Sequence, residues 1–406
     1  MTQNCVIVGA SHTAAQLVGS LRQGGWSGDI TLIGDEPYVP YHHPPLSKGY
    51  LSGEKSAEDL LIRSAEAYSL SGVKLKLGRR VVAIDRNEKT VTTDNGNVIA
   101  YDKLVLATGA RVRKLPIDGV ELPGVYYLRN MNDVKAIQTA LSSARRAVVI
   151  GGGYIGLETA ASLTKLGVEV TVLEAMPRIL QRVTAPELSE FYKRVHTEEG
   201  VQILENIIAD SIVKTSSGLK VRDKCGAEYP ANFVIIGIGV IPNTELADEA
   251  GLDVGNGIVV NKYCQTSDPN IYAAGDVTWH FNIKYGRHLR LESVPNTTEQ
   301  AKVVAAHVCG KPKIYDSLPW FWSDQFDLKL QIAGLSEGYD ELIIRGNIKE
   351  GRSFSAFYFK GERLLAVDAI NAPREFAMTR MLLMKGQSLD RGKISDMSLA
   401  IKEAII

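Results

Sequence analysis

The chain has 406 residues, enough for two or three domains with hydrophobic cores of their own. Lysine plus arginine (46) balance aspartate plus glutamate (46), and this zero net charge argues against a nucleic-acid-binding protein, which normally carries a basic surplus. Apolar residues make up 45% of the chain and charged residues 23%, a composition typical of a globular protein and not of a disordered, collagen-like or coiled-coil chain.

The first predicted element is an apolar strand at Cys5–Val8, which runs into a turn and a helix. The turn residues are Gly9, Ser11 and Ala14. The next strand ends at Asp35, 26 residues after Gly9. This order is typical of a dinucleotide-binding βαβ unit: glycines allow a tight turn and the approach of a pyrophosphate, and an acid about 20 residues on accepts the ribose hydroxyls. Alanine fits the third turn position, whereas serine at the second brings a side chain toward the pyrophosphate.

The same pattern returns 142 residues later, with the strand Ala147–Ile150. Here all three glycines are present, at Gly151, Gly153 and Gly156, and the following strand ends at Glu174, 23 residues after Gly151. One glycine motif is a weak signal, but two copies, each with strand, helix and acid in register, predict two dinucleotide-binding domains. The alternative is a pair of glycine-rich turns in an ordinary α/β protein.

Three further segments each read as a short apolar strand that ends in a tight turn: Leu104–Gly109, Phe233–Gly239 and Ile271–Asp276. Strands of this kind favour sheets that are covered on both faces. The turn after the third strand ends in Asp276, which fits a helix N-cap, a ligand of a bound dinucleotide, or both.

After Pro319 the pattern changes. Two strands, Phe354–Phe359 and Leu364–Ile370, flank a turn at Lys360–Glu362, and a helix follows at Pro373–Lys385. These elements predict a third domain of the α+β type.

The four cysteines stand far apart, at positions 5, 225, 264 and 309, and form no CxxC pair and no metal-ligand cluster. Isolated thiols indicate a reducing compartment. The chain opens directly into an apolar strand, and its longest apolar run, Phe233–Ile241, is far shorter than the roughly 20 residues of a membrane helix. We therefore expect a cytoplasmic protein with no metal site and with neither nucleic acid nor membrane as a partner.

Together the motifs resemble those of the FAD-dependent pyridine-nucleotide oxidoreductases of the glutathione-reductase fold. The segments Pro40–Lys48 and Pro319–Gln325 narrow the resemblance to the putidaredoxin reductase family, the ferredoxin or rubredoxin reductases that serve bacterial monooxygenases and Rieske dioxygenases. The resemblance covers nearly the whole chain. The expected fold is α/β, with two Rossmann-like dinucleotide-binding domains and a C-terminal α+β domain.

The order of the motifs predicts how these domains share the chain. Residues 1–110 and 243–316 are expected to form a discontinuous FAD-binding domain, because Asp276 returns to the FAD site after the second glycine loop. Residues 111–242 form the inserted NAD-binding domain, and residues 317–406 form the C-terminal domain.

The resemblance implies an FAD site in the first domain. Its pyrophosphate would lie against Gly9, Ser11 and Ala14, its adenosine ribose at Asp35, and its ribityl or pyrophosphate portion at Asp276. The other residues expected at FAD are His43, Lys48, Val82, Ala107, Thr108, Gly109, Val294 and Trp320. His43 stands where relatives carry arginine, which predicts weaker or pH-dependent FAD binding; the alternative is an ordinary loop histidine.

The resemblance also implies an NAD site in the second domain. The residues expected there are Gly151, Gly153, Tyr154, Ile155, Gly156, Glu158, Glu174 and Gly239. Glu174 favours NADH, because a carboxylate accepts the 2′-hydroxyl of its ribose and repels the 2′-phosphate of NADPH. Arg178 and Arg182 stand nearby and would weaken that repulsion.

Three residues are expected to be catalytic: Lys48, Glu158 and Trp320. The family places the lysine at the reactive edge of the flavin, where a cation favours the anionic reduced form, and the glutamate at the nicotinamide, with the two able to pair. Trp320 is expected near the flavin and its electron exit. We expect Trp322 to point to the opposite face of the strand and to pack in the core.

Disulfide reductases of this fold carry a cysteine pair beside the flavin, and NADH peroxidases a single cysteine, but this chain has none between Cys5 and Cys225. Electrons must therefore leave the flavin directly. The resemblance then implies an NADH:ferredoxin reductase, which passes electrons from NADH through FAD singly to a [2Fe-2S] ferredoxin that feeds a monooxygenase or Rieske dioxygenase. The alternatives are a rubredoxin reductase, an NADH oxidase, and an NADH-responsive flavoprotein like apoptosis-inducing factor.

Ferredoxins are usually acidic, so a basic docking rim is expected. The candidate residues are Arg287, Arg290, Lys311 and Lys313.

Overall fold

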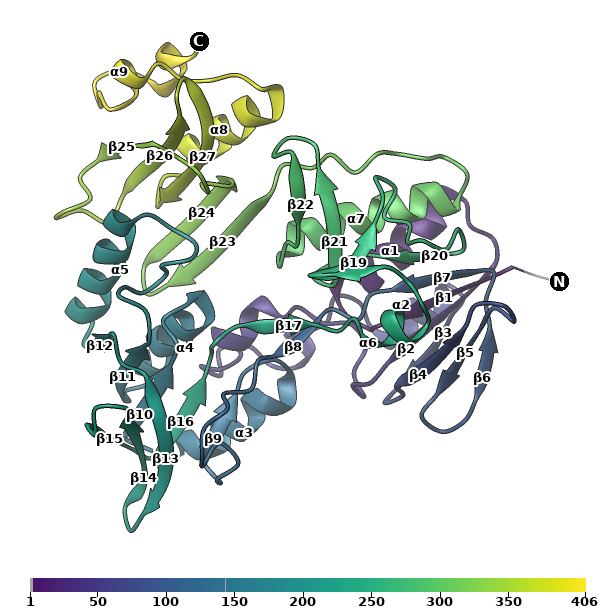
Figure 1. Ribbon diagram of the computed structural model, residues 1–406, viewed down its shortest axis with the longest axis horizontal. Coiled ribbons are helices and arrows are strands. Elements are labelled where there is room, and N and C mark those ends of the chain that lie inside the picture. The colour runs from purple at the N-terminus through teal and green to yellow at the C-terminus, as the bar shows by residue number, and fades with distance from the viewer. Residues whose placement is uncertain (1–2, 143) are drawn as a thin grey trace. The chain divides into compact units, whose positions relative to one another are not determined.

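The computed structural model describes residues 3–142 and 144–406, which divide into two compact units (Figure 1). Of these residues, the first unit comprises 3–42, 58–111 and 240–319, and the second comprises 43–57, 112–142, 144–239 and 320–406. Each unit contains a parallel sheet with helices, and the C-terminal part of the second unit is a separate antiparallel sheet with helices, so the predicted fold class is confirmed. Because this division groups 112–239 with 320–406, the boundaries of the three domains stay a prediction.

The first unit is built on a parallel sheet with the strand order β20-β7-β1-β2-β3. Its strands are β1 (Asn4–Val8), β2 (Asp29–Gly34), β3 (Val73–Leu77), β7 (Lys103–Leu106) and β20 (Ile271–Ala273). Its helices are α1 (His12–Gly24), α2 (Ala65–Leu70), α6 (Glu245–Glu249), α7 (Val294–Val308) and the 3-10 turn η2 (Glu58–Leu60). The edge strand β20 comes from the part of the chain after residue 240, so distant segments complete one sheet.

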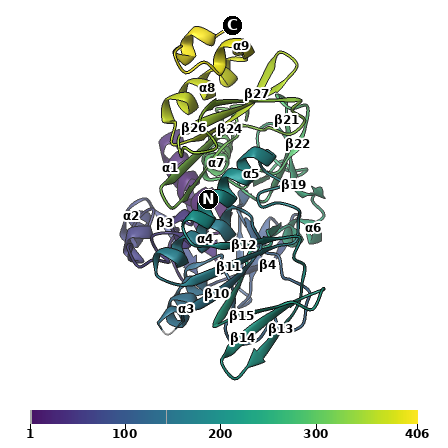
Figure 2. The same ribbon diagram turned by 90° about the vertical axis from the view of Figure 1, so that its left-hand side faces the viewer.

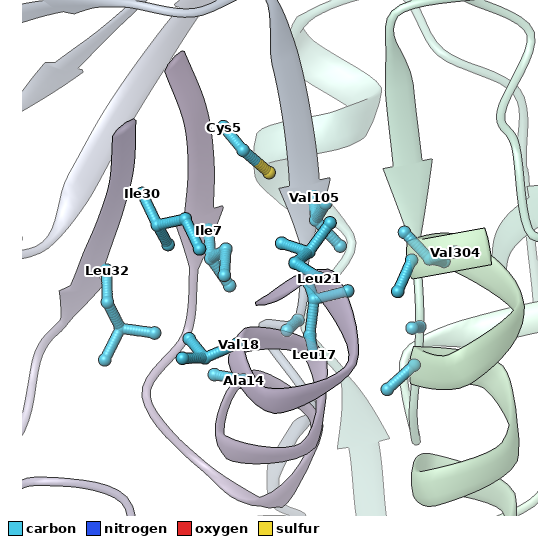
Figure 3. Packing of buried hydrophobic residues seen from close by; sticks show 14 of the residues in the cluster. Cys5, Ile7, Ala14, Leu17, Val18, Leu21, Ile30, Leu32, Val105 and Val304 are labelled. Atoms are coloured by element: carbon cyan, nitrogen blue, oxygen red, sulfur yellow. The ribbon is translucent and has the colours of Figure 1, made fainter. Parts of the chain in front are cut away.

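Both faces of this sheet are buried. Cys5 and Ile7 of β1 point toward α1 and α7, whose Leu17 and Val304 belong to the same cluster (Figure 3). Val6, on the opposite face, packs in a second cluster. Successive side chains of a strand point to opposite faces, so a strand buried on both faces reads as a continuous apolar run. The prediction of a sheet covered on both faces is confirmed.

Two smaller sheets complete the first unit. One is antiparallel and contains β4 (Val81–Asp85), β5 (Thr90–Thr93) and β6 (Val98–Ala100). The other contains β18 (Val254–Gly255), β19 (Gly257–Val260), β21 (Thr278–Asn282) and β22 (Arg287–Leu289). Val91 and Ile258 of these sheets are fully buried in the cluster that covers Val6. They therefore shield the face of the parallel sheet that α1 and α7 leave open.

The second unit contains a parallel sheet with the order β12-β11-β10-β16-β9. Its strands are β9 (Val125–Tyr127), β10 (Arg146–Ile150), β11 (Glu169–Glu174), β12 (Gln202–Glu205) and β16 (Phe233–Ile236), and its helices are α3 (Met131–Leu141), α4 (Tyr154–Lys165) and α5 (Pro186–Glu198). An antiparallel ribbon of β13 (Ala209–Thr215), β14 (Gly218–Asp223) and β15 (Glu228–Ala231) packs against it (Figure 2). The segment 43–57, with the 3-10 turn η1 (Pro44–Ser47), belongs to the same unit.

The C-terminal part of the second unit is an antiparallel sheet in the order β23-β24-β27-β26-β25. Its elements are β23 (Trp320–Gln325), β24 (Leu328–Gly334), β25 (Glu341–Gly346), β26 (Phe354–Lys360), β27 (Arg363–Ile370), α8 (Pro373–Lys385), α9 (Arg391–Ile394) and η3 (Ile401–Ala404). The predicted hairpin and the helix that follows it are confirmed. The remaining short strands, β8 (Ala110–Val112) and β17 (Val240–Pro242), lie where the chain passes between the units.

Candidate functional site

The first glycine turn follows β1 in the first unit. The Gly9 N–H donates to Ile33 O at 2.8 Å, and Gly9 has a φ of +110°. A Cβ at this position would lie 2.1 Å from Ala107 O, so the backbone directly after β7 fills the space that a side chain needs. Ala14, fully buried on α1, packs toward the sheet. The turn therefore brings the beginning of α1 to the carboxyl ends of β1 and β7.

The second turn repeats this geometry in the second unit. The Gly151 N–H donates to Leu173 O at 2.8 Å, Gly151 has a φ of +114°, and a Cβ there would lie 2.4 Å from Gly237 O. A Cβ on Gly156 would lie 2.1 Å from Gly151 O. Gly153, by contrast, has no described residue within 4 Å of its Cβ position apart from its own neighbours in the chain, and as the N-cap of α4 it offers no capping side chain. The first-turn N–H groups of α4 are thus open to an anion such as a pyrophosphate.

Glu174, at the end of β11, is hydrogen-bonded to the second glycine turn. Its carboxylate accepts hydrogen bonds from Gly152 N and Met176 N, both at 2.7 Å. Arg178 donates to Ser189 Oγ and to the Gln181 carbonyl, which turns its guanidinium toward α5. A nitrogen of Arg182 lies 3.8 Å from the Cβ position of Gly239.

The remaining residues expected at NAD, Tyr154 and Ile155, form the first turn of α4, where Ile155 is 48% exposed.

A residue that sequence reasoning missed holds the Ala107–Gly109 turn of the first unit. Asn243 Nδ2 donates to Thr108 O and Thr108 Oγ1 donates to Asn243 O, each at 2.8 Å, while Arg111 donates to Asn243 Oδ1 at 2.9 Å. No local pattern links positions 108 and 243, which are 135 residues apart. Asn243 therefore holds the turn through both its side-chain amide and its backbone carbonyl.

The other predicted FAD residues of the first unit lie as follows. Asp35 is exposed after β2 and pairs with Arg80 at 3.3 Å. Val82 on β4 is 46% exposed. Asp276 is half-buried after β20, beside Gly275, whose N–H donates to Gln300 of α7 at 2.7 Å; Val294 is the first residue of α7.

A charged cluster lies in the second unit. Lys48 Nζ and Glu158 Oε2 form an ion pair at 2.7 Å, with Glu158 3% exposed and Lys48 20% exposed. Ser47 Oγ donates to Glu158 Oε2 and Ser323 Oγ to Glu158 Oε1, both at 2.6 Å. Ser162 Oγ donates to Ser47 O at 2.7 Å, which fixes η1 on α4. A buried carboxylate is stable when hydrogen bonds and a counter-charge compensate for its lost hydration, and all of them are present.

Trp320 and Trp322 correct one prediction. Their ring centroids lie 5.5 Å apart on the same face of β23, because residues two apart on a strand point the same way, so the expectation of opposite faces was wrong. Both are half-buried. Trp320 packs against Phe376, and the guanidinium of Arg380 lies 5.2 Å from its ring centroid.

The histidines around position 43 fall into different units. His43 is the N-cap of η1 in the second unit, half-buried. In the first unit, His12 Nε2 lies 3.1 Å from His42 Nδ1. Burial, together with His42, lowers the pKa of His12 to about 4. This pair at the start of α1 was not predicted, because only the fold brings residues 12 and 42 together.

The basic residues expected to form a docking rim all belong to the first unit. Arg290 pairs with Glu292, and Lys311 donates to Gly24 O at 3.0 Å.

Within residues 3–142 and 144–406, no group of His, Cys, Asp and Glu side chains is arranged to hold a metal ion. No helix in those ranges is long and apolar enough to cross a membrane.

Comparison with known proteins relates the whole chain to one group of reductases. Residues 3–301 match the family described as pyridine nucleotide-disulphide oxidoreductase, and residues 320–405 match the reductase C-terminal domain. Putidaredoxin reductase of Pseudomonas putida is 43% identical over 99% of this chain and 96% of its own. The 5,5′-dehydrodivanillate O-demethylase ferredoxin reductase subunit of a Sphingobium species is 40% identical over 98% of both chains.

A solved structure agrees with these relatives. The reductase in a covalent putidaredoxin reductase–putidaredoxin complex has 43% identity and a TM-score of 0.96, with 99% of this chain and 98% of that chain covered.

Proposed function

Because the chain belongs to the pyridine nucleotide-disulphide oxidoreductase family, we propose that it is an FAD-dependent NADH:ferredoxin reductase. It would pass electrons singly to a [2Fe-2S] ferredoxin, which in turn feeds a monooxygenase or a Rieske dioxygenase. Relatives named as reductases of such systems support this assignment. The four cysteines, all free thiols, support a place in the cytoplasm.

One observation carries the proposal: two dinucleotide turns of the same geometry stand in a chain without a cysteine between Cys5 and Cys225. Two turns fit two dinucleotides, one resident and one that arrives as the electron donor. Without a thiol after the first turn, the electrons have no internal disulfide to reduce. They must leave for an external acceptor.

The shapes of the two turns fit FAD and NADH. Gly9 and Gly151 each press against the neighbouring strand, and this contact places a helix N-terminus at the carboxyl edge of its sheet. We assign FAD to the turn with Gly9, with Asp35 at its ribose and Asp276 near its phosphates. We assign NADH to the turn with Gly151, with Glu174 at the ribose. The hydrogen bonds from Gly152 and Met176 orient the Glu174 carboxylate for that role.

FAD, when bound, supplies the conversion between a two-electron hydride donor and one-electron acceptors. The residues of this chain provide charge and position. Lys48 offers a cation to stabilise negative charge on a reduced cofactor, and Glu158 holds the lysine in place through its 2.7 Å ion pair. Glu158 itself has no spare freedom, since both of its oxygens accept serine hydroxyls.

The proposal is tested by anaerobic titration of the purified protein with NADH, followed by its visible absorption. We expect a yellow protein that is bleached by about one equivalent of NADH, since FAD takes up one hydride. The reduced protein is then mixed with a [2Fe-2S] ferredoxin, a rubredoxin or oxygen, and the rates are compared. Fastest reduction of the ferredoxin supports the assignment. Fastest reaction with rubredoxin or oxygen, or no turnover with any acceptor, identifies one of the three alternatives.

A further inference from the structure

The hydrogen bonds at Glu158 continue beyond the ion pair. Ser323 Oγ donates to Glu158 Oε1 at 2.6 Å, Gln325 Nε2 donates to Ser323 Oγ at 3.1 Å, and His196 Nε2 lies 2.8 Å from Gln325 Oε1. None of the four side chains is more than 3% exposed. They come from three elements of the second unit: α4 supplies Glu158, β23 supplies Ser323 and Gln325, and α5 supplies His196.

The direction of every bond in this chain follows from the first one. A carboxylate only accepts, so the Ser323 hydroxyl must donate its proton to Glu158. The Ser323 oxygen is then available only as an acceptor, which turns the NH2 group of Gln325 toward it. The Gln325 oxygen consequently faces His196, whose Nε2 must carry a hydrogen.

The environment of His196 agrees with this direction. Burial lowers the pKa of His196 to about 4, so the ring is neutral and carries a single N–H. Among the described residues its Nδ1 has no hydrogen-bond partner, and only Nε2 is bound. One tautomer alone, with the hydrogen on Nε2, satisfies the chain.

We infer that Ser323, Gln325 and His196 are positioning residues, which hold the carboxylate of Glu158 so that its Oε2 faces Lys48. The inference rests on the proposed function for its use in catalysis. It assigns a role to Ser323 and Gln325 of β23, next to the tryptophans. It also means that the tautomer of His196 depends on whether position 158 carries a carboxylate or an amide. Among the described residues, Glu158 is hydrogen-bonded to Ser323 and not to Gln325 or His196, so the effect of these two residues passes through Ser323.

The decisive variant is Glu158→Gln, which keeps the shape of the side chain. Ser47 Oγ and Lys48 Nζ both donate to the Oε2 position, so the amide oxygen must take that place and the amide NH2 must face Ser323. The NH2 then donates to Ser323 Oγ, and the hydroxyl turns to Gln325. Gln325 flips, and its NH2 faces His196. His196 must accept at Nε2, so its hydrogen moves to Nδ1.

The tautomer is measured by NMR of protein labelled with 15N-histidine, in which the two nitrogens of a neutral ring give separate signals. The chain has 7 histidines, and the variant His196→Gln assigns the signal. We expect the Nε2–H form in the wild type and the Nδ1–H form in Glu158→Gln. Ser323→Ala, which leaves Gln325 free to adopt either orientation, should give a mixture. The matched control is Ser355→Ala, on β26 of the same sheet, which removes a 1% exposed hydroxyl without a hydrogen-bond partner in the described chain.

A second measurement separates positioning from general support of the fold. In Ser323→Ala we expect the limiting rate of flavin reduction by NADH to fall about tenfold, the cost of one hydrogen bond to a charged group, while the Kd of NADH changes less than twofold. Ser323→Thr, which keeps the hydroxyl, should restore the rate.

The inference is overturned if Glu158→Gln and Ser323→Ala leave the His196 signals as they are in Ser355→Ala. The NMR result does not depend on electron transfer. Failure of the inference is therefore distinguishable from failure of the proposed function, which appears as a protein that NADH does not reduce.

Discussion

Gly153 allows a substitution that should leave the fold intact and weaken nucleotide binding. It has φ −80° and ψ 178°, a conformation open to any residue, and in the part of the chain that the structure describes only its own chain neighbours lie within 4 Å of its Cβ position. In Gly153→Ala the less flexible unfolded chain contributes about 0.4–1 kcal/mol of stability. Alanine is a poorer N-cap than glycine, by a similar roughly 0.5–1 kcal/mol. The two terms offset each other, so the unfolding temperature should stay within about 2 °C of the wild type.

Binding should respond differently, because the added methyl group stands where the backbone of the loop is proposed to meet the pyrophosphate. Loss of one N–H contact to a phosphate, a hydrogen bond to a charged group of about 1.5–3 kcal/mol, weakens the Kd of NADH about 10- to 100-fold. The Kd is measured by calorimetric titration with NAD⁺ and the stability by thermal unfolding of the same samples.

Gly156→Ala serves as the contrasting variant. Its Cβ would lie 2.1 Å from Gly151 O, so it should lower the unfolding temperature as well as the affinity. An unchanged Kd in a Gly153→Ala protein of unchanged stability would refute the assignment of this loop to the pyrophosphate.

Three further outcomes are expected. Glu174→Gln removes the charge that opposes a 2′-phosphate, so the preference for NADH over NADPH, measured as the ratio of kcat/KM values, should fall about tenfold; an unchanged ratio would separate Glu174 from the ribose. Asn243→Ala removes the amide that donates to Thr108 O and should cost about 1–2 kcal/mol at that turn, seen as a lower flavin-to-protein absorbance ratio after gel filtration; full retention of flavin would contradict this. Burial, with a smaller contribution from His288, lowers the pKa of His280 from 6.5 to about 4, and neither of its ring nitrogens has a partner among the described residues. Below pH 6.5 the histidine is protonated in the unfolded chain but stays neutral in the folded chain down to about pH 4. The free energy of unfolding therefore falls as the pH drops toward 4, by about 2 kcal/mol at pH 5. His280→Phe should remove that part of the loss between pH 7 and pH 5 in urea unfolding, and an identical pH dependence would exclude His280 as its source.

The sequence was sufficient for the parts of this protein that depend on neighbouring residues. The strand at Cys5–Val8 and the hairpin around Gly361 follow from apolar runs and turn residues, and the structure contains both. The two glycine turns were visible for the same reason, since a positive φ at Gly9 and Gly151 is a local requirement. These features, with the missing cysteines, are sufficient to indicate the family.

The tertiary structure decided which distant side chains meet. Ser323 reaches Glu158 across 165 positions, and Asn243 reaches Thr108 across 135. The tryptophans of β23 share a face, contrary to our prediction. Hydrogen bonds of this kind depend on the position and direction of two elements packed together, and no periodicity along the chain encodes that relation. Interactions between residues near in sequence therefore determined the elements and the turns. The tertiary structure alone determined the charged cluster of Lys48 and Glu158 and the side chains that hold it.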